Sequence, residues 1–530
     1  MNIISKTQSI CPVCRKPVEA FYMQEDGCCD MGTRVYFVQN CPEHGEFKTL
    51  AAERADDFKS WIKHPVMNIP PQTAITQGDP EDDSCPLHCG TCDNHLQTAC
   101  CVLIDVTCRC NQHCPYCFAL SGEDVDPKEP TLEEISARYD WLLQQGEDGR
   151  EFNIQLSGGE PTVREDLPEI IRMARDKGFS YVQINTNGRR LAEEEGYARV
   201  LKEAGASVIF MQFDGTRDDI YLKLRGEALF DKKVQAIRNC EKAGLAVTLV
   251  PTVVRGINDD NIGEMMDFLV ENVNVVKGIH FQPASFFGRY PEGDELEGRI
   301  TMFGLLRELE SQRPAFRYSD SLPISTGHTL CCFYSTYIKE PDGTIRCTLT
   351  NKQRQEGVSC CGTSNAAAGC CEAADCCAEA EPDGISADCC STAGCSCDDP
   401  GSGVVSVGCC DMAQADKLEV IKKDRDYVLD KWDIAVPEAN AGQDENPWQE
   451  ATDCCSGGEA AFASKYKSAD EITDLDEFLT YYRRNTFTVT GMAFQDITNL
   501  DAERLKRCRV VQMTDDYRLI PFCAYNTIYR

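Results

Sequence analysis

Three closely spaced cysteines, Cys110, Cys114 and Cys117, have the residue type and spacing best suited to chemistry. Each thiolate can hold one iron, so the three leave one corner of a four-iron cluster without a protein ligand, whereas clusters that only transfer electrons are closed by four cysteines. An iron with a vacant position can bind a small molecule. The motif Cys-x3-Cys-x2-Cys therefore predicts an open 4Fe-4S site.

A second motif follows at the end of a later apolar run, where Gly158, Gly159, Glu160 and Pro161 occur in succession. Three cysteines alone are a weak signal, because clustered cysteines also bind zinc. The pattern becomes specific when Tyr116, directly before the last cysteine, and the Gly-Gly-Glu-Pro sequence are added. The fold must then bring the two motifs together.

Six apolar runs between residues 101 and about 285 alternate with segments of helical periodicity. The runs are short, as buried parallel strands are, and cover residues 102–106, 153–156, 181–184, 208–213, 246–250 and 278–281. Helical periodicity covers residues 131–145, 166–177, 191–204, 232–243 and 259–271. This alternation predicts an α/β fold with a parallel sheet and right-handed crossovers, curved into a partial (βα)6 TIM-like barrel.

Residues able to do chemistry follow successive predicted strands. The cysteine motif follows the first run, the Gly-Gly-Glu-Pro sequence the second, Asn185 and Asn187 the third, Asp214 the fourth and residues 251–252 the fifth. The carboxyl ends of parallel barrel strands lie on one face of the barrel. Asp214 or Asn187 alone would be an ordinary turn residue, but five such strand ends together predict a functional site.

The N-terminal segment contains two tight turns that each offer two metal ligands. Cys11 and Cys14 form one pair, Cys41 and His44 the other, and residues 33–39 between them have the composition of a strand. The four ligands suit tetrahedral zinc in a zinc-ribbon or rubredoxin-like knuckle. Replacing His44 by Cys28 or Cys29 would give a four-sulfur site that also suits iron, so the sequence leaves mononuclear zinc or iron open.

Two further cysteine groups predict auxiliary clusters. Four cysteines in a short segment can close a complete 4Fe-4S cluster, and a second zinc knuckle is the alternative; they are Cys85, Cys89, Cys92 and Cys100. Cys508 and Cys523 near the C-terminus could be free buried thiols. Together with Cys332, or with Cys331 or Cys347 instead, they predict another cluster, which makes two or three 4Fe-4S clusters in all.

Residues 351–468 differ sharply in composition from the rest of the chain. Alanine, glycine, serine and acidic residues dominate, and vicinal cysteine pairs such as Cys360 and Cys361 recur. Few large apolar side chains are available for a core, so this insert is expected to be disordered unless a ligand orders it. Vicinal thiols suit soft metals, which makes a thiol-rich protein that binds or delivers a metal or metalloid the alternative function.

These patterns divide the chain into six segments. They are a metal-knuckle domain at 1–77, an auxiliary-cluster segment at 78–100, the barrel core at 101–300, a core extension at 301–350, the cysteine-rich insert at 351–468, and a small C-terminal α+β cap at 469–530.

Composition limits the partners and the compartment. A net charge of -33 over 530 residues disfavours nucleic acid and anionic membrane surfaces as partners of the whole protein. No apolar run is long enough to span a bilayer and no signal peptide precedes the first domain, so we expect a cytoplasmic protein. In a large chain without an export signal, 34 cysteines favour metal binding over disulfides.

The cysteine and Gly-Gly-Glu-Pro motifs resemble those of the radical SAM superfamily. The resemblance implies that Cys110, Cys114 and Cys117 ligate a cluster whose open iron binds S-adenosylmethionine, and that its reductive cleavage yields a 5'-deoxyadenosyl radical acting on a substrate that the sequence does not identify. It implies an electron donor of the ferredoxin or flavodoxin type. It further implies cofactor contacts from the backbone near Tyr116 and from Gly158, Gly159, Glu160, Pro161, Asn185, Asn187 and Asp214. The extra thiol of Cys108 departs from the pattern.

Motifs outside the barrel core extend the resemblance. The cysteine pairs near the N-terminus, Gln212-Phe-Asp-Gly, His280-Phe-Gln-Pro, Met492-Ala-Phe-Gln-Asp and Ile520-Pro-Phe-Cys-Ala-Tyr-Asn are similar to those of the group that includes tetraether lipid synthase. Within that group the chain most resembles the radical SAM (seleno)protein TrsS family. For tetraether lipid synthase the implied reaction joins unactivated carbon chains, but the cysteine-rich insert departs from such an enzyme.

Overall fold

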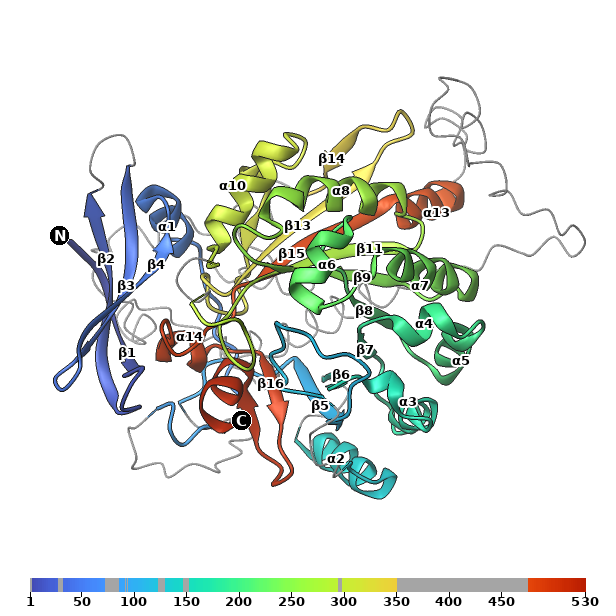
Figure 1. Cartoon of the computed structure of the whole chain (residues 1–530), viewed down its shortest axis with the longest axis horizontal. Helices are drawn as coiled ribbons and strands as arrows, with labels where there is room; N and C mark the ends of the chain where they lie inside the picture. The colour runs from blue at the N-terminus through green and yellow to red at the C-terminus, as the bar shows by residue number, and fades with distance from the viewer. Residues whose placement is uncertain are drawn as a thin grey trace, which may run out of the picture.

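The computed structural model describes residues 2–26, 32–71, 85–90, 92, 94–122, 129–145, 152–293, 298–349 and 475–530. Two sheets dominate these residues, a small one at the N-terminus and a large one that forms the barrel (Figure 1). Cys28, Cys29 and the predicted insert at 351–468 lie outside the described residues. None of the helices in the described ranges has the length and apolar content needed to cross a bilayer.

The N-terminal sheet is antiparallel in the order β1-β2-β3-β4. Its strands are β1 (Asn2–Ile10), β2 (Pro17–Asp26), β3 (Thr33–Cys41) and β4 (Gly45–Ala52), and helix α1 (Ala55–Ile62) follows. Phe37 of β3 stacks edge-on against Tyr22 of β2, and Phe58 of α1 packs on the same tyrosine. The strand predicted at 33–39 is confirmed as β3.

The six predicted barrel strands are all present and pair in parallel as neighbours. They are β5 (Cys101–Thr107), β6 (Asn153–Gly158), β7 (Val182–Thr186), β8 (Val208–Gln212), β9 (Val247–Val250) and β11 (Val276–Pro283); the short β10 (Thr252–Val253) also pairs with β11. Alternate residues such as Ile154 and Leu156 of β6 are fully buried in the main core, while Gln155 between them is partly exposed. The partial α/β barrel is therefore confirmed.

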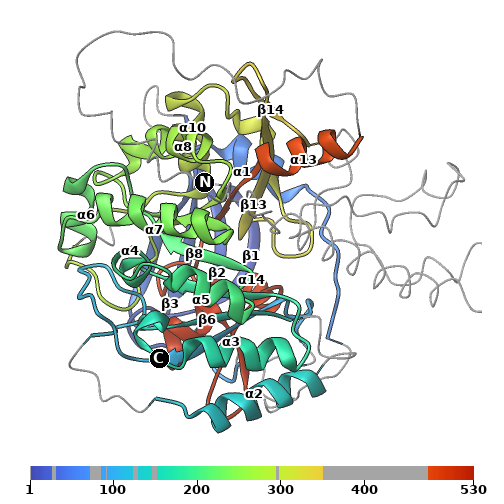
Figure 2. The ribbon, with the colours of Figure 1, turned by 90° about the vertical axis from the view of Figure 1, so that its right-hand side faces the viewer.

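Helices cover the outer side of these strands (Figure 2). They are α2 (Leu132–Gln144), α3 (Leu167–Asp176), α4 (Arg189–Glu193), α5 (Tyr197–Ala204), α6 (Asp218–Arg225), α7 (Phe230–Ala243), α8 (Ile262–Glu271) and α10 (Met302–Gln312). The single helix expected at 191–204 is two, because Gly196 takes a left-handed conformation (φ 88°) before α5. Helix α6 had no counterpart in the sequence analysis.

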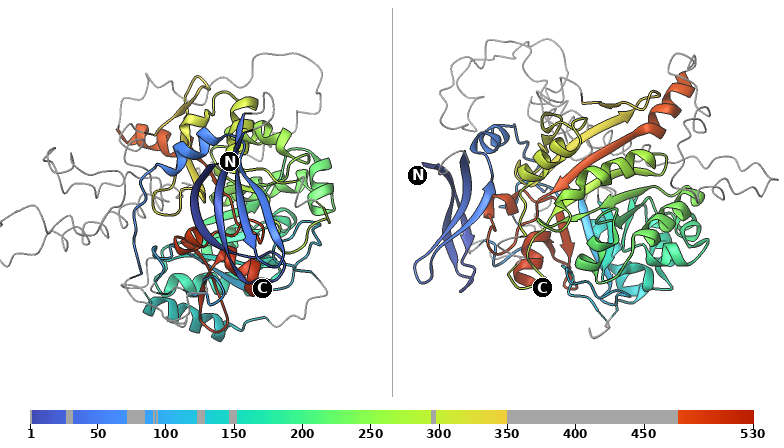
Figure 3. Two further views of the ribbon diagram at one scale, coloured as in Figure 1. Left: turned by 90° about the vertical axis from the view of Figure 1, so that its left-hand side faces the viewer. Right: turned by 45° about the horizontal axis from the view of Figure 1, so that its top comes forward.

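The C-terminal segment adds strands to both edges of the barrel sheet (Figure 3). After α13 (Leu475–Asn485), β15 (Thr486–Met492) pairs in parallel with β11, and β16 (Val510–Met513) pairs in parallel with β5. The C-terminal segment also contains α14 (Ala502–Lys506), β17 (Leu519–Pro521) and α15 (Phe522–Ala524). Three strands from before it extend the sheet beyond β15: β13 (Cys332–Lys339), which pairs with β15, and β12 (Leu322–Pro323) and β14 (Ile345–Cys347), which pair with β13. Strands of the expected C-terminal cap are thus continuous with the core sheet.

The N-terminal sheet docks on the same C-terminal segment. Asp501, just before α14, accepts hydrogen bonds from the Tyr22 hydroxyl (2.9 Å) and the Thr7 hydroxyl (2.5 Å). The side-chain Nε2 of Gln39 donates to the Ile497 carbonyl at 3.0 Å. These contacts join residues far apart in sequence, so residues 497–501 of the C-terminal segment connect the N-terminal sheet to the barrel sheet of which β15 and β16 are part.

A substitution at Gly491 tests the packing of β13 against β15. A Cβ atom at this position would lie 2.2 Å from Cε1 of Phe333, whose ring covers the glycine from the paired strand β13. We expect Gly491→Ala to lower the free energy of unfolding by about 1–3 kcal/mol, because β13 must shift to make room. Urea titration with hydrogen exchange of the β13 and β15 amides measures the effect.

Gly327→Ala is the matched control, because its added Cβ would meet nothing closer than the Arg507 carbonyl oxygen at 3.9 Å. Equal urea midpoints and equal exchange in the two variants would contradict this packing.

Candidate functional site

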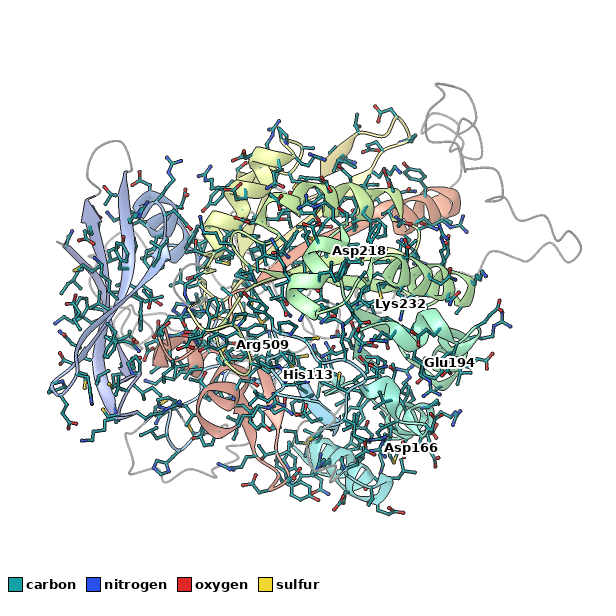
Figure 4. All side chains as sticks on the ribbon, viewed as in Figure 1. His113, Asp166, Glu194, Asp218, Lys232 and Arg509 are labelled. Carbon is teal, nitrogen blue, oxygen red and sulfur yellow. The ribbon has the colours of Figure 1, made fainter. Side chains whose placement is uncertain are left out.

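The predicted cluster cysteines lie on the loop that follows β5. Cys114 is buried, and Cys110 and Cys117 are half-buried. His113 of this loop lies centrally in the molecule, whereas Asp166, Glu194, Asp218 and Lys232 lie among the outer helices (Figure 4). The loop therefore sits at the carboxyl end of the first barrel strand, as the sequence analysis expected.

Gly158 and Gly159 press against the backbone at the start of this loop. A Cβ atom would lie 2.1 Å from the Thr107 carbonyl oxygen if added to Gly158, and 2.2 Å from the Arg109 carbonyl oxygen if added to Gly159. The Gly159 N–H donates to the Thr107 carbonyl (2.8 Å) and the Glu160 N–H to the Arg109 carbonyl (2.9 Å). Only glycines allow the two strand ends to approach this closely.

The Glu160 carboxylate links two of the predicted site segments, its own turn after β6 and the end of β7. It is buried and accepts hydrogen bonds from the Thr186 hydroxyl at 2.7 Å and the Asn187 N–H at 2.6 Å, both at the end of β7. The hydroxyl and N–H of Thr162 also donate to it, at 2.6 and 3.1 Å. All four of these hydrogen bonds come from protein groups. Together they hold the carboxylate beside Pro161 without an ion pair.

Asn187 and Asn185 have different surroundings. The Asn187 side chain donates to the Asn111 side-chain oxygen within the cysteine loop at 2.8 Å. Asn185 accepts from Gln183 at 2.8 Å and is partly exposed on the inward side of β7. The structure thus ties Asn187 to the loop, whereas Asn185 contacts Gln183 of its own strand and Gln155 of β6 and is partly exposed.

Asp214 is fully buried and takes part in an ion pair. Both of its oxygens lie 2.7 Å from nitrogens of Arg225, the last residue of α6, and the Thr252 N–H donates to one of them at 3.1 Å. Arg225 also donates to the Tyr116 carbonyl at 2.8 Å. Asp214 therefore acts on the loop through Arg225, and its own side chain is shielded from solvent.

Besides Arg225, two further basic residues of the site were missed in the sequence analysis. Arg289 donates to the Cys114 carbonyl at 2.8 Å, and its backbone pairs with that of Cys117. Lys233 of α7 is buried and donates to the Asn187 carbonyl at 2.5 Å; burial lowers its pKa to about 8. Arg289 follows the sixth barrel strand, so extending the survey of strand ends to that strand could have found it.

Burial also sets the direction in which the pKa values of the loop cysteines shift. Burial first, and the nearby Glu160 carboxylate second, raise the pKa of Cys110 to about 12. Burial likewise raises the pKa of Cys114. These cysteines are neutral thiols unless a cation stabilises their thiolates, which is what iron does when it binds. Three thiols near enough to interact electrostatically, beside two crowded glycines, thus fit an iron-sulfur cluster with its bound cofactor.

The N-terminal knuckle brings all four of its predicted ligands together. Among the described residues it is the one group whose ligand atoms all lie within 4.8 Å of one another: Cys11, Cys14, Cys41 and His44. Nδ1 of His44 is 3.4 Å from Sγ of Cys41 and 3.7 Å from Sγ of Cys11, and the sulfurs of Cys14 and Cys41 are 3.9 Å apart. These separations match tetrahedral zinc with bonds of about 2.1–2.3 Å.

The remaining cysteines of the described residues gather in two neighbouring groups. The thiols of Cys85 and Cys89 share a hydrogen bond, and Cys89 interacts electrostatically with Cys92 and Cys508. Cys508 in turn interacts with Cys523 and with Cys331. Cys331, one of the alternatives to Cys332, thus lies near Cys508, while Cys332 as a ligand stays a prediction. The predicted sets around Cys100 and Cys508 lie next to each other.

Arg504 lies beside the group formed by Cys331, Cys508 and Cys523. Its buried guanidinium lies 3.4 Å from Sγ of Cys331 and donates to the Ala493 carbonyl at 2.6 Å. The Gln495 N–H donates to Sγ of Cys523 at 3.2 Å, but burial dominates and raises the pKa of that thiol to about 12.

The chain is similar to known proteins over both of its sheets. Residues 104–269 match the Radical SAM superfamily, and residues 3–53 match the HMPTM N-terminal zinc ribbon domain. A 7,8-dihydro-6-hydroxymethylpterin dimethyltransferase of Methanocaldococcus jannaschii is 33% identical over 99% of this chain and 94% of its own length. A GTP 3',8-cyclase of Nautilia profundicola is 26% identical over 42% of this chain and 69% of its own length.

Solved structures match over smaller parts of the chain. Streptococcus suis SuiB bound to precursor peptide SuiA superposes with a TM-score of 0.33 and 17% identity, over 41% of this chain and 46% of that chain.

Metal binding at the knuckle can be measured directly. We expect Cys41→Ser to lose about one equivalent of zinc per chain and to speed amide exchange in β1 to β4, because a structural zinc site contributes folding free energy. Inductively coupled plasma mass spectrometry measures the zinc. Cys240→Ala removes a buried thiol of α7 and serves as the control. Unchanged zinc in Cys41→Ser would contradict the assignment.

Proposed function

The chain belongs to the radical SAM superfamily, in the family of the M. jannaschii dimethyltransferase, and on this premise we propose that Cys110, Cys114 and Cys117 hold the open 4Fe-4S cluster at which it cleaves S-adenosylmethionine. The observation that carries the proposal is the backbone contact of Gly158 and Gly159 with the start of the cysteine loop. It supports a shared site for the cluster and the methionine part of the cofactor.

The residues of this site would bind and orient the cofactor. When bound and reduced, the cluster with S-adenosylmethionine supplies a 5'-deoxyadenosyl radical that abstracts a substrate hydrogen. Gly158, Gly159 and the Glu160 carboxylate would hold the methionine amino group, because a buried carboxylate attracts an ammonium. Asn185 and Asn187 would contact the ribose, Pro161 begins the turn that sets Glu160, and the Tyr116 backbone would meet adenine.

Methyl transfer to a carbon of a pterin-like substrate is the leading reaction class. It rests on the relative that aligns along nearly the whole chain, since the ribbon, the barrel and the C-terminal segment all fall within that alignment. Carbon-carbon joining between two substrate carbons is the second candidate, supported by the motifs shared with the tetraether lipid synthase group. That finer grouping, and the TrsS family within it, stays a prediction.

Two auxiliary clusters complete the proposal. The grouping of Cys85, Cys89 and Cys92, with Cys100 as the expected fourth ligand, supports one cluster, and Cys331 with Cys508 and Cys523 supports another. A radical SAM enzyme needs a reductant, for which we propose a ferredoxin or flavodoxin.

The six segment boundaries and the cytoplasmic location stay predictions. The alternative function, thiol-based metal delivery, depends on residues 351–468, outside the described ranges.

Cleavage of S-adenosylmethionine tests the site. Reconstituted without oxygen and reduced with dithionite, the full chain is expected to form 5'-deoxyadenosine, whereas Cys114→Ala should reduce the rate at least about a hundredfold, because the loss of one of three ligands disrupts the cluster. Liquid chromatography quantifies the product. Cys240→Ala should keep the wild-type rate. Absence of cleavage by wild-type protein with an intact cluster would contradict the proposal.

The origin of the new carbon separates the two reaction classes. With S-adenosylmethionine carrying a 13C-labelled methyl group and 6-hydroxymethyl-7,8-dihydropterin as substrate, we expect a product heavier by the labelled methyl group, measured by mass spectrometry. Direct joining of two substrate carbons would leave the product unlabelled. A labelled product supports methyl transfer, and an unlabelled coupled product contradicts it.

A further inference from the structure

We propose that the cavity between the N-terminal sheet and the barrel is a binding site for a short aliphatic carboxylate, held by Arg504 and Asn499. This site goes beyond the proposed function, because none of the cysteines and glycines of the candidate site lines the cavity. Its volume, the unpaired charge of Arg504 and the unused hydrogen-bond donors point to the same class of ligand.

The cavity lies where the N-terminal sheet meets the barrel. Its wall comes from β2, β3, β4 and α1 on one side, and from the end of β11, from α10 and from residues within 493–504 on the other. Pro283, the last residue of β11, is part of this wall, so the cavity adjoins the barrel face that carries the cysteine loop. A volume of about 60 Å³, where one water needs roughly 10–15 Å³, leaves room for about four to six non-hydrogen atoms.

Aromatic and aliphatic side chains form much of the cavity wall. They include Phe37, Phe58, Phe303 and Phe494, together with Ala51 of β4. A strongly hydrated inorganic ion would lose its water contacts against such a wall without replacement, whereas an apolar part of a ligand gains from burial there.

Arg504 brings a positive charge to this cavity that no carboxylate of the described residues neutralises within 4.0 Å. Its exposed fraction is 7%. Three other arginines of the described residues are also buried, and each has a carboxylate partner: Arg138 with Asp515, Arg164 with Asp166, and Arg225 with Asp214. A buried charge without a counter-ion is costly, so an anion in the cavity would stabilise the folded protein.

Unused donors of two side chains are available to such an anion. Nε and Nη2 of Arg504 bond Sγ of Cys331 and the Ala493 carbonyl, while Nη1 donates to no group in the described part of the chain. Oδ1 of Asn499 accepts from the Asp496 N–H at 2.8 Å, and its Nδ2 likewise donates to none of the described residues. Arg504 and Asn499 both line the cavity.

The other polar side chains of the wall already donate to carboxylates of the protein: Tyr22 to Asp501, Thr301 to Glu53 and Arg299 to Asp496. The unused donors of Arg504 and Asn499 therefore require a ligand that supplies acceptors and negative charge. A carboxylate supplies both and forms charge-assisted hydrogen bonds with a guanidinium. Phosphate has more oxygens than these two donor groups can satisfy.

Equilibrium dialysis of 14C-propionate against the full-length protein, purified without oxygen, measures the site directly. We expect a single saturable site in the wild-type protein. Arg504→Gln removes the charge, and Ala51→Leu fills the cavity while keeping Arg504, so each should weaken propionate at least about tenfold.

Competition on the wild-type protein needs no variant. Propionamide has the shape of propionate without its charge, and hexanoate exceeds the volume of the cavity. Each should displace labelled propionate at least about tenfold less well than unlabelled propionate does. Equal or better competition by propionamide, hexanoate or phosphate would overturn the assigned ligand class.

Arg138→Gln is the matched control, because Arg138 of α2 is also 7% exposed but has Asp515 as its partner and does not line the cavity. Its affinity for propionate should stay within about twofold of wild type. No saturable binding to wild-type protein, or undiminished binding to Ala51→Leu, would overturn the proposal. The dialysis contains neither S-adenosylmethionine nor a reductant, so its result is separate from any failure of the proposed function.

Discussion

The contact between Gly158–Gly159 and the backbone of residues 107–109 is the constraint on which the candidate site depends. Two strand ends meet there with no room for a side-chain atom on either glycine. This contact aligns β5 with β6 at their carboxyl ends, brings the cysteine loop over the barrel, and places Glu160 beneath it. A methyl group at Gly159 would overlap the loop backbone itself, which cannot move without carrying Cys110 with it.

Buried charge around this contact is compensated by local bonds. Glu160 accepts four hydrogen bonds, and Asp214 is neutralised by Arg225, so neither carboxylate is left unsatisfied in the low-dielectric interior. Each of these carboxylates also ties neighbouring strand ends together. Apolar packing alone would let neighbouring strand ends slide past each other. The hydrogen bonds and ion pair of these carboxylates hold the strand ends in one arrangement.

The C-terminal segment connects the barrel to the N-terminal sheet and to the auxiliary cysteines. Its strands extend both edges of the barrel sheet, Asp501 receives the hydroxyls of Thr7 and Tyr22, and Cys508 and Cys523 lie near cysteines contributed by the 85–92 segment and by Cys331. Metal binding at these cysteines would therefore be coupled to docking of the N-terminal sheet, because the same segment carries both sets of contacts.

The sequence by itself determined the local patterns: six apolar strands, the Cys-x3-Cys-x2-Cys loop, the Gly-Gly-Glu-Pro turn and the paired knuckle ligands, each specified by residues close together in the chain. Helix α6 was not predicted because charged residues at both of its ends make its apolar pattern short. Tertiary structure alone decided that β15 and β16 join the barrel, that Cys331 lies near Cys508, and that Arg225 and Arg289 hold the cysteine loop. The physical reason is that these pairings connect residues distant in sequence, several through backbone carbonyls, which every residue carries and no sequence pattern marks.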